Sequence, residues 1–268
     1  MDIDKINRSL RNPAYFRLHL FDSLPSTNTF LFNLGKQGAP EWSVAVAERQ
    51  TAGKGRYRRR WESPAGKSLL FSLLLRPPLE TRFLNLINLF TALTMAQYLE
   101  TRAREHSAAA LEISLKWPND LFIRGKKLCG ILLEASFTAE RLDYLVIGIG
   151  LNVNQSPGDF SEEIRPAATS LKLASGREWE REFLLAGFLE KFYEDYRRFF
   201  PGNFAPLVQL YKEKVLYLGK PISVDAGGRK IEGIFRDLTP EGYLVLERNG
   251  RETLVSAGDI FGGMAHRA

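Results

Sequence analysis

Apolar residues along the chain recur with two different spacings, one typical of helices and the other typical of strands. Helical spacing predicts a short helix that begins at Ser26-Thr27-Asn28 and ends near Gly35 or Gly38, because Ser and Thr are favoured at helix starts. Longer stretches with helical spacing are 82–104, which is apolar on most of its surface, 178–200 and 204–216. Runs that predict strands are 44–47, 67–75, 112–116, 121–123, 128–135 and 142–153. This mixture of elements predicts the α+β class.

The pattern changes near residues 216–219. From Gly219 onward, short apolar runs alternate with turn signals, of which Asn249-Gly250 is one. The runs are 222–224, 230–235, 243–246 and 253–255. About 50 residues of this texture predict a small β-barrel. We therefore expect two domains, 1–217 and 218–268, in which the smaller one assists without carrying the chemistry.

Composition and charge narrow the class of protein. The chain has 268 residues, of which 44% are hydrophobic and 25% charged, as is ordinary for a globular protein with a sizeable core. A single cysteine, Cys129, excludes an internal disulfide framework, and we expect it to be a small core residue. The net charge of +6 suits a polyanionic ligand or an acidic protein partner. With no secretory signal and no apolar run of about 20 residues, the expected compartment is the cytoplasm, without membrane contact.

A basic, glycine-containing loop follows the predicted strand 44–47. It runs from Gln50 to Trp61 and carries five basic side chains between Lys54 and Arg60. Glycine lets backbone N–H groups approach a ligand closely, and the cations would gather around an anion such as phosphate. We expect the loop to be mobile when empty and to close over its ligand. From the loop alone, a solvated basic segment or a nucleic-acid-binding patch explains the pattern about equally well.

Two further motifs favour the interpretation of this loop as a ligand-binding loop. The segment Lys116-Trp117-Pro118-Asn119-Asp120-Leu121 leads into Lys127-Leu128-Cys129-Gly130-Ile131-Leu132, and Ser26-Thr27-Asn28 lies upstream. In this order, and over residues 21–260, the motifs resemble those of the biotin–protein ligase family. Gly148 and Gly150 lie inside the strand 142–153, where glycine often marks the close approach of a ligand or another backbone.

The resemblance implies a particular fold and activity. It implies a mixed-sheet catalytic domain of the biotin/lipoate ligase type, similar to class II synthetases, with an SH3-like C-terminal barrel. The chain resembles the enzyme-only members, which lack an N-terminal DNA-binding domain. Such a ligase activates biotin with MgATP as biotinyl-5′-AMP and passes biotin to one lysine of a biotin carboxyl carrier protein. Acyl activation of this kind needs cations for phosphate and an apolar slot for the acid, and the sequence shows no convincing nucleophilic triad.

The resemblance also implies roles for individual residues. Catalytic residues would be Lys127, Arg56 and Asp120. Biotin would be bound by Ser26, Thr27, Asn28, Gln50, Lys54, Gly55, Arg56 and Lys127. ATP would be bound by Arg59, Trp61, Asn119, Asp120 and Asn152. Asp120 would also contact Mg²⁺, which commonly uses one or two carboxylates plus phosphate oxygens. The loop departs from the family where Lys54 replaces the usual arginine and Arg58 stands at a position that is often glycine.

Two alternatives stay open at this point. A lipoate–protein ligase shares the catalytic fold, although the loop and the Lys116–Asp120 motif together favour biotin. A non-enzymatic nucleic-acid-binding module would use the basic residues 54–60. On the ligase reading we expect no nucleic-acid partner, and either a monomer or a homodimer.

Overall fold

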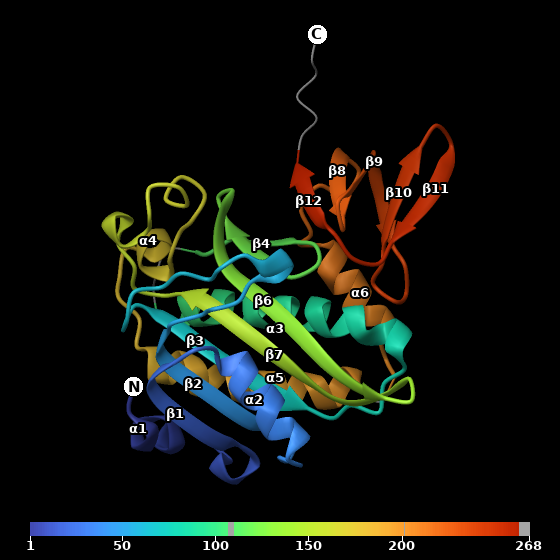
Figure 1. Cartoon of the computed structure of the whole chain (residues 1–268). Helices are drawn as coiled ribbons and strands as arrows, with labels where there is room; N and C mark the ends of the chain where they lie inside the picture. Colours follow the sequence, from blue (N-terminus) through green and yellow to red (C-terminus); the bar gives the residue numbers. More distant parts are fainter. Residues whose placement is uncertain (107–109, 201, 263–268) are drawn as a thin grey trace.

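A computed structural model describes residues 1–106, 110–200 and 202–262 (Figure 1). A seven-stranded sheet forms its centre, in the order β1-β2-β3-β7-β6-β5-β4. The strands are β1 (Arg17–Leu24), β2 (Ser43–Gln50), β3 (Ser68–Leu75), β4 (Ile113–Lys116), β5 (Asp120–Ile123), β6 (Lys126–Thr138) and β7 (Arg141–Asn152). Strands β1 and β2 run parallel, whereas the other neighbours are antiparallel. The sheet is therefore mixed, as the resemblance implied.

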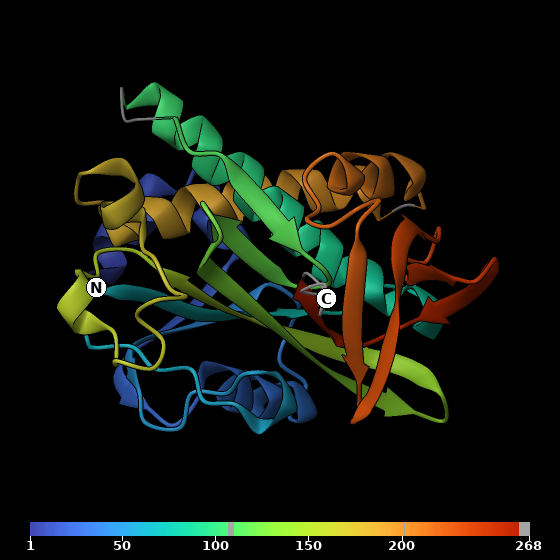
Figure 2. The same ribbon diagram turned by 90° about the horizontal axis from the view of Figure 1, so that it is seen from above.

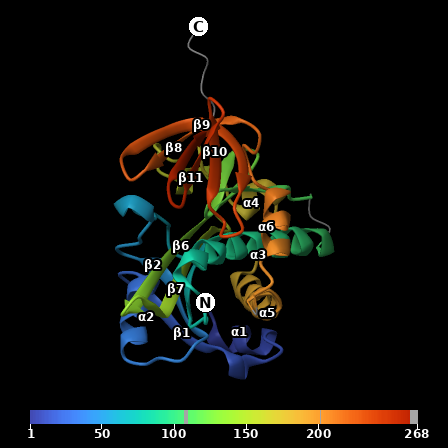
Figure 3. The ribbon, with the colours of Figure 1, turned by 90° about the vertical axis from the view of Figure 1, so that its right-hand side faces the viewer.

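Helices cover both faces of this sheet. One face carries α3 (Leu84–Glu105) and α5 (Arg181–Phe199), and the other carries α2 (Thr27–Lys36), as Figures 2 and 3 show. The remaining helices are α1 (Ile3–Ser9), α4 (Leu171–Ser175) and α6 (Ala205–Lys212). Single 3₁₀ turns are η1 (Pro13–Tyr15), η2 (Arg56–Arg58), η3 (Thr81–Phe83) and η4 (Pro157–Asp159).

Burial follows from this layering. All eight residues of β3 are buried, because α2 covers one side of the central strands and α5 the other. Helix α3 is buried on successive residues from Leu89 to Ala96, since the sheet, α5 and α6 surround it. This explains why its sequence is apolar around most of the helix.

The C-terminal residues form a second, five-stranded antiparallel sheet in the order β11-β10-β9-β8-β12. Its strands are β8 (Pro221–Ala226), β9 (Arg229–Leu238), β10 (Leu244–Arg248), β11 (Arg251–Val255) and β12 (Asp259–Gly262). The indole N–H of Trp117 and the amide of Asn85 both donate to the carbonyl oxygen of Gly242, at 3.0 Å and 2.6 Å. These bonds join the small sheet to the large domain (Figure 1). The last residues of the expected domain, 263–268, lie outside the described residues.

The fold class was predicted correctly, but one helix was predicted too long. The helix expected over 204–216 ends at Lys212. Beyond it, the N–H of Leu115 donates to Lys214 and the N–H of Leu216 donates to Leu115, at 2.9 Å and 2.7 Å. Val215 thereby pairs with the outer edge of β4, and this pairing ends the helix. Sequence analysis also missed α1, β1, α4 and β12, which are short or lie at the edge of a sheet.

Candidate active site

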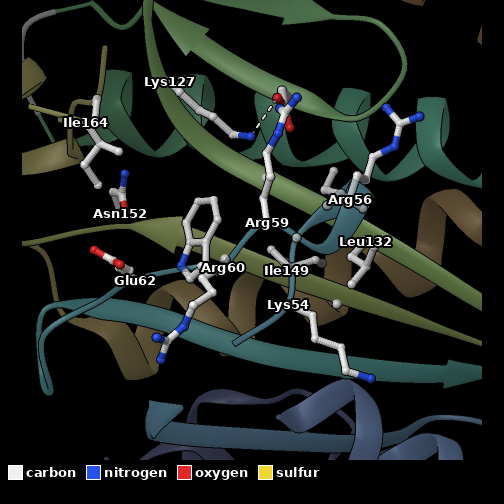
Figure 4. Close-up of a pocket in the computed structure, with 18 of the residues that line it drawn as sticks. Lys54, Arg56, Arg59, Arg60, Glu62, Lys127, Leu132, Ile149, Asn152 and Ile164 are labelled. Atoms are coloured by element: carbon white, nitrogen blue, oxygen red, sulfur yellow. Dashed lines mark ion pairs between the residues drawn. The ribbon is translucent and has the colours of Figure 1, made fainter. Parts of the chain in front are cut away.

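A cavity of about 480 Å³ lies over one face of the large sheet. Its walls come from β6, β7, the N-terminal end of α2, the basic loop, segment 160–168 and the start of β12. Figure 4 shows side chains of the loop around the cavity, together with Lys127, Asn152 and Ile164. The cavity brings together every site residue named from the sequence: Ser26, Thr27, Asn28, Gln50, Lys54, Gly55, Arg56, Arg59, Trp61, Asn119, Asp120, Lys127 and Asn152. Their separate roles remain predictions.

The polar end of the cavity is built at the start of α2. Ser26 caps the helix, its hydroxyl oxygen accepting from the N–H of Thr29 at 3.4 Å. The N–H of Thr27 donates to Gln50 Oε1 at 2.7 Å, which ties the end of β2 to the helix. A Cβ at position 148 would lie 2.1 Å from Asn28 Oδ1, so only glycine fits beside Asn28. The sequence predicted capping, and it predicted that a ligand or another backbone approaches Gly148 closely. In the structure the side chain of Asn28 makes that approach, and Gly148 also lines the cavity.

An apolar wall separates the polar end from the charged end. Leu132 supplies an apolar side chain from β6 (Figure 4), and the glycines at 130, 148 and 150 leave the strand surface beside it bare. The side chains of Ile131 and Ile149 alternate with these positions and belong to the core on the opposite face of the sheet. The indole of Trp61 covers Gly130 and Gly150, which are paired across these strands. A Cβ at these two glycines would lie 2.9 Å and 2.5 Å from the ring. The absence of these two side chains therefore lets Trp61 lie against the sheet.

The basic loop folds back on itself above this wall. The N–H of Gly55 donates to Arg59 at 2.7 Å, and the N–H of Trp61 donates to Gly53 at 3.0 Å. Tyr57 takes a positive φ of 53° at the turn. A Cβ at Gly53 would lie 2.6 Å from the carbonyl oxygen of Trp61, so the turn requires glycine there. Whether the loop moves when ligand binds remains a prediction.

Two arginines of the loop converge on Asp259, at the start of β12. Arg56 Nη1 lies 3.2 Å from Asp259 Oδ1, and Arg59 Nη2 lies 2.8 Å from Asp259 Oδ2. Arg56 also donates to Asn119 Oδ1 at 3.3 Å and to the carbonyl oxygen of Gly258 at 3.1 Å. The small domain thus supplies a residue to the cavity wall. Sequence analysis missed Asp259, because no local pattern connects it with a loop some 200 residues earlier.

Lys127 and Asp120 form the charged end. Lys127 Nζ lies 2.7 Å from Asp120 Oδ2 and 5.7 Å from the centre of the Trp61 ring. The N–H of Lys127 donates to Ala167 at 2.7 Å, and its carbonyl accepts from Thr169 at 2.9 Å. Lys127 lies in β6, and these bonds pair its backbone with segment 167–169. Its ammonium reaches into the cavity (Figure 4).

The amide residues near this end are held by the protein. The side chain of Asn119 donates from Nδ2 to the carbonyl oxygen of Ile131. The backbone carbonyl of Asn119 accepts from the N–H of Ile131 at 3.0 Å. Asn152 donates to Thr169 at 2.9 Å and accepts from Gln155 Nε2 at 2.9 Å. A ligand would therefore meet amides whose orientation is already fixed.

Lys116 adds a second cation near Asp120, on the neighbouring strand. Burial lowers the pKa of Lys116, although the carboxylate of Asp120 acts in the opposite direction. Lys116 faces Asp120 across β4 and β5 but does not line the cavity. Together with Lys127, it surrounds Asp120 with positive charge.

Other lining residues could not be found from the sequence. They include Phe160, Ile164 and Ala168 from the segment after η4, as well as Glu62 and Glu163. Arg60, one of the five cations of the basic loop, also lines the cavity. Among residues 1–106, 110–200 and 202–262, no cluster of three or more His, Cys, Asp or Glu side chains could hold a metal ion. No helix in the described part of the chain is long and apolar enough to cross a membrane.

Comparison with known proteins agrees with this arrangement. Residues 20–152 match the Biotin/lipoate A/B protein ligase family, and residues 217–263 match the Biotin protein ligase C terminal domain. The fold and the site therefore define a ligase that acts on a carboxylic acid of the biotin or lipoate type. The chain belongs to the biotin protein ligase family, as its relatives show.

The bifunctional ligase/repressor BirA of Bacillus subtilis is 34% identical over 239 residues, covering 89% of this chain and 72% of that protein. The biotin–[acetyl-CoA-carboxylase] ligase of Mycobacterium tuberculosis is 33% identical over 238 residues, covering 88% of this chain and 85% of that protein. Among solved structures, the biotin protein ligase from Aquifex aeolicus in complex with biotin and ATP has a TM-score of 0.77 and 31% identity. That match covers 91% of this chain and 97% of the other.

Proposed function

We propose that this chain is an ATP-dependent biotin–protein ligase that forms biotinyl-5′-AMP and transfers biotin to a lysine of a carrier protein. The observation that carries the proposal is the order of groups along one cavity. A polar end at α2 is followed by an apolar wall and then by Arg56, Arg59 and Lys127. A ring with polar atoms, an aliphatic tail and a carboxylate would meet matching groups in that order. Relatives with the same activity support it.

The cationic groups suit the first step. An oxygen of the biotin carboxylate attacks the α-phosphorus of ATP, and pyrophosphate leaves. Negative charge on the phosphate oxygens would be stabilised by Arg56 and by Lys127, whose charged donors lie along the same cavity. The ion pairs of Arg56 and Lys127 with carboxylates set these side chains in place before substrate arrives. In the second step the amine of the acceptor lysine attacks the acyl carbon, and AMP leaves.

Asp120 fits a magnesium ion that arrives with ATP. Mg²⁺ commonly takes one or two carboxylates plus phosphate oxygens, and Asp120 is the carboxylate beside Lys127. The protein offers no larger acidic cluster among the described residues, so most ligands of the ion would be phosphate oxygens and water. In the free enzyme the ammonium of Lys127 forms an ion pair with the carboxylate of Asp120. We infer that Asp120 both positions Lys127 and contacts MgATP.

Biotin is favoured over lipoate by the polar end of the cavity. Thr27, Asn28 and Gln50 present hydrogen-bonding groups there. The ureido ring of biotin has N–H donors and a carbonyl acceptor that can pair with such groups. The dithiolane ring of lipoate has neither, and buried polar groups left unpaired cost binding energy. Membership of the biotin protein ligases also argues against a non-enzymatic module that uses residues 54–60 to bind nucleic acid.

We further propose that residues 1–217 form the catalytic domain and residues 218–268 the SH3-like domain. The proposed boundary falls between α6 and β8. The partner would be the carrier domain of a biotin-dependent carboxylase, in keeping with the name of the mycobacterial relative.

A pyrophosphate-release assay tests the first step. The protein, with MgATP and biotin, is expected to release pyrophosphate, and lipoate in place of biotin is expected to give the background rate. Release that does not depend on biotin, or that is as fast with lipoate, would contradict the proposal.

A further inference from the structure

A chain of hydrogen bonds runs beneath the polar end of the cavity, from Glu134 on β6 to the start of α2. Asn28 Nδ2 donates to Glu134 Oε2 at 2.8 Å. Asn28 Oδ1 lies 2.6 Å from Ser72 Oγ, which in turn lies 2.7 Å from Thr27 Oγ1. Asn28, Ser72 and Thr27 are 3%, 0% and 3% exposed, so water does not interrupt the chain. The four side chains therefore act on one another directly.

Glu134, together with the carbonyl of Leu132, sets the direction of the bonds in this chain. An ionised carboxylate only accepts hydrogen bonds, so Asn28 must turn its NH₂ group toward it. The carbonyl of Leu132, 3.3 Å from Asn28 Nδ2, requires the same orientation. The amide oxygen of Asn28 then faces Ser72 and must accept the hydroxyl proton of Ser72. Ser72 has one proton, which goes to Asn28, so the 2.7 Å contact between Ser72 and Thr27 uses the proton of Thr27. The Thr27 hydroxyl also lies 3.1 Å from Gln50 Oε1, a longer contact that competes for the same proton.

The direction of these hydrogen bonds determines which donors and acceptors the cavity presents to a ligand. With its proton directed at Ser72, the hydroxyl of Thr27 faces the cavity with its lone pairs. Gln50 Oε1 accepts from the N–H of Thr27 at 2.7 Å, so the amide nitrogen of Gln50 is the group left to donate. One acceptor and one donor are thereby set side by side at the polar end.

We propose that Glu134 is a positioning residue for ligand binding, a carboxylate that holds Thr27 as an acceptor through Asn28 and Ser72. This inference rests on the proposed function, because the ligand used to test it is biotin. Glu134 lines no part of the cavity itself, so its effect on the ligand is indirect.

Glu134 also lies near a cation, Lys54. The effect of this ion pair must be distinguished from the effect of the hydrogen-bond chain. Lys54 Nζ lies 3.7 Å from Glu134 Oε1, and the two side chains are 48% and 32% exposed. Exposed pairs at such a distance contribute little. The short, buried bonds through Asn28 are therefore expected to carry most of the effect.

A double-mutant cycle tests the proposal through the dissociation constant of biotin, measured by calorimetry. In Glu134→Gln, an amide that can donate as well as accept replaces the carboxylate, and only the longer bond from Asn28 to the Leu132 carbonyl oxygen still favours the original direction of the chain. We expect biotin binding to weaken about five- to tenfold. In a Ser72→Ala background, where the chain is already broken, the same substitution is expected to weaken binding less than twofold. Thr27→Val supplies a second background in case Ser72→Ala does not fold.

Two controls and one kinetic measurement complete the test. Glu140→Gln changes an exposed carboxylate in the β6–β7 turn and is expected to leave biotin binding unchanged. In a Lys54→Met background, the penalty of Glu134→Gln is expected to persist. The rate of pyrophosphate release at saturating biotin is expected to stay within twofold, because Glu134 acts on binding.

The proposal is overturned if Glu134→Gln weakens biotin binding equally in the parent and in the Ser72→Ala background, or if it does not weaken binding in the parent. It is also overturned if the weakening disappears in the Lys54→Met background. These outcomes are distinct from failure of the proposed function. If the parent protein does not bind biotin, the proposed function fails. If the parent binds biotin and the cycle shows no coupling, only the role of Glu134 fails.

Discussion

Gly150→Ala is expected to damage nucleotide binding while leaving the fold intact. The added methyl group would lie 2.5 Å from Cε2 and 2.8 Å from Nε1 of the Trp61 indole. Carbon atoms pack best at about 3.5–4.0 Å, so the ring must retreat by roughly 1 Å. Trp61 belongs to the loop and is half-buried, whereas Gly150 lies in the middle of the sheet. The indole, rather than the strand, is therefore expected to move.

The magnitude follows from the role that the resemblance implies for Trp61 in ATP binding, which we take to be a stacking contact with the adenine base. Stacking of a base on an aromatic side chain contributes about 1–3 kcal/mol. Its loss corresponds to an increase of about five- to 150-fold in the KM for ATP. We expect the free energy of unfolding to change by less than about 1 kcal/mol, since no backbone hydrogen bond is lost.

The assay is biotin-dependent pyrophosphate release, measured while the concentration of ATP or of biotin is varied. Two other glycine substitutions are compared with Gly150→Ala. Gly148→Ala places a methyl group 2.1 Å from Asn28 Oδ1 and is expected to raise the KM for biotin instead. Gly158→Ala meets nothing within 4 Å and is expected to change neither constant. The reasoning is refuted if Gly150→Ala leaves the KM for ATP within twofold of the parent, or raises only the KM for biotin.

Three further predictions concern single side chains. Lys127→Ala is expected to slow biotin-dependent pyrophosphate release at least about tenfold, since a charged hydrogen bond contributes about 1.5–3 kcal/mol; Lys126→Ala is the control, and equal rates for the two variants would refute the role. Asp259→Asn is expected to raise the KM for ATP about fivefold, because the ion pairs that position Arg56 and Arg59 weaken by up to about 1 kcal/mol; an unchanged or lower KM would contradict this. Burial raises the pKa of the Cys129 thiol well above its usual range, so Cys129 stays neutral and should resist alkylation at pH 8 in folded protein. Mass spectrometry showing alkylation as fast as in denatured protein would contradict it.

The sequence predicted the cavity well where function is concentrated in short motifs. Asn119, Asp120 and Lys127 all line the cavity, and they were named because their short motifs resemble those of the ligase family. The glycines of β7 were expected to admit a close neighbour. The identity of that neighbour depends on tertiary packing, which brings Trp61 and Asn28 onto the strand.

Residues whose contacts come from distant parts of the sequence could not be predicted in this way. Asp259 reaches the cavity only because the small domain folds over the loop. Ser72 did give a signal, since it is a polar residue inside the apolar run of β3, but its partners come from α2. The end of α6 at Lys212 was missed because pairing of Val215 with β4 overrides the helical pattern.

The most direct test of the ligase assignment is transfer of biotin to protein. The protein is incubated with biotin, MgATP and a biotin carboxyl carrier domain, and the mass of the carrier is measured. We expect the carrier to gain one biotinyl group at a single lysine. We expect no gain when ATP is omitted, and a much smaller gain at equal time when Lys127→Ala replaces the parent. A carrier of unchanged mass in the presence of active, folded parent protein, or a gain from lipoate in place of biotin, would contradict the assignment.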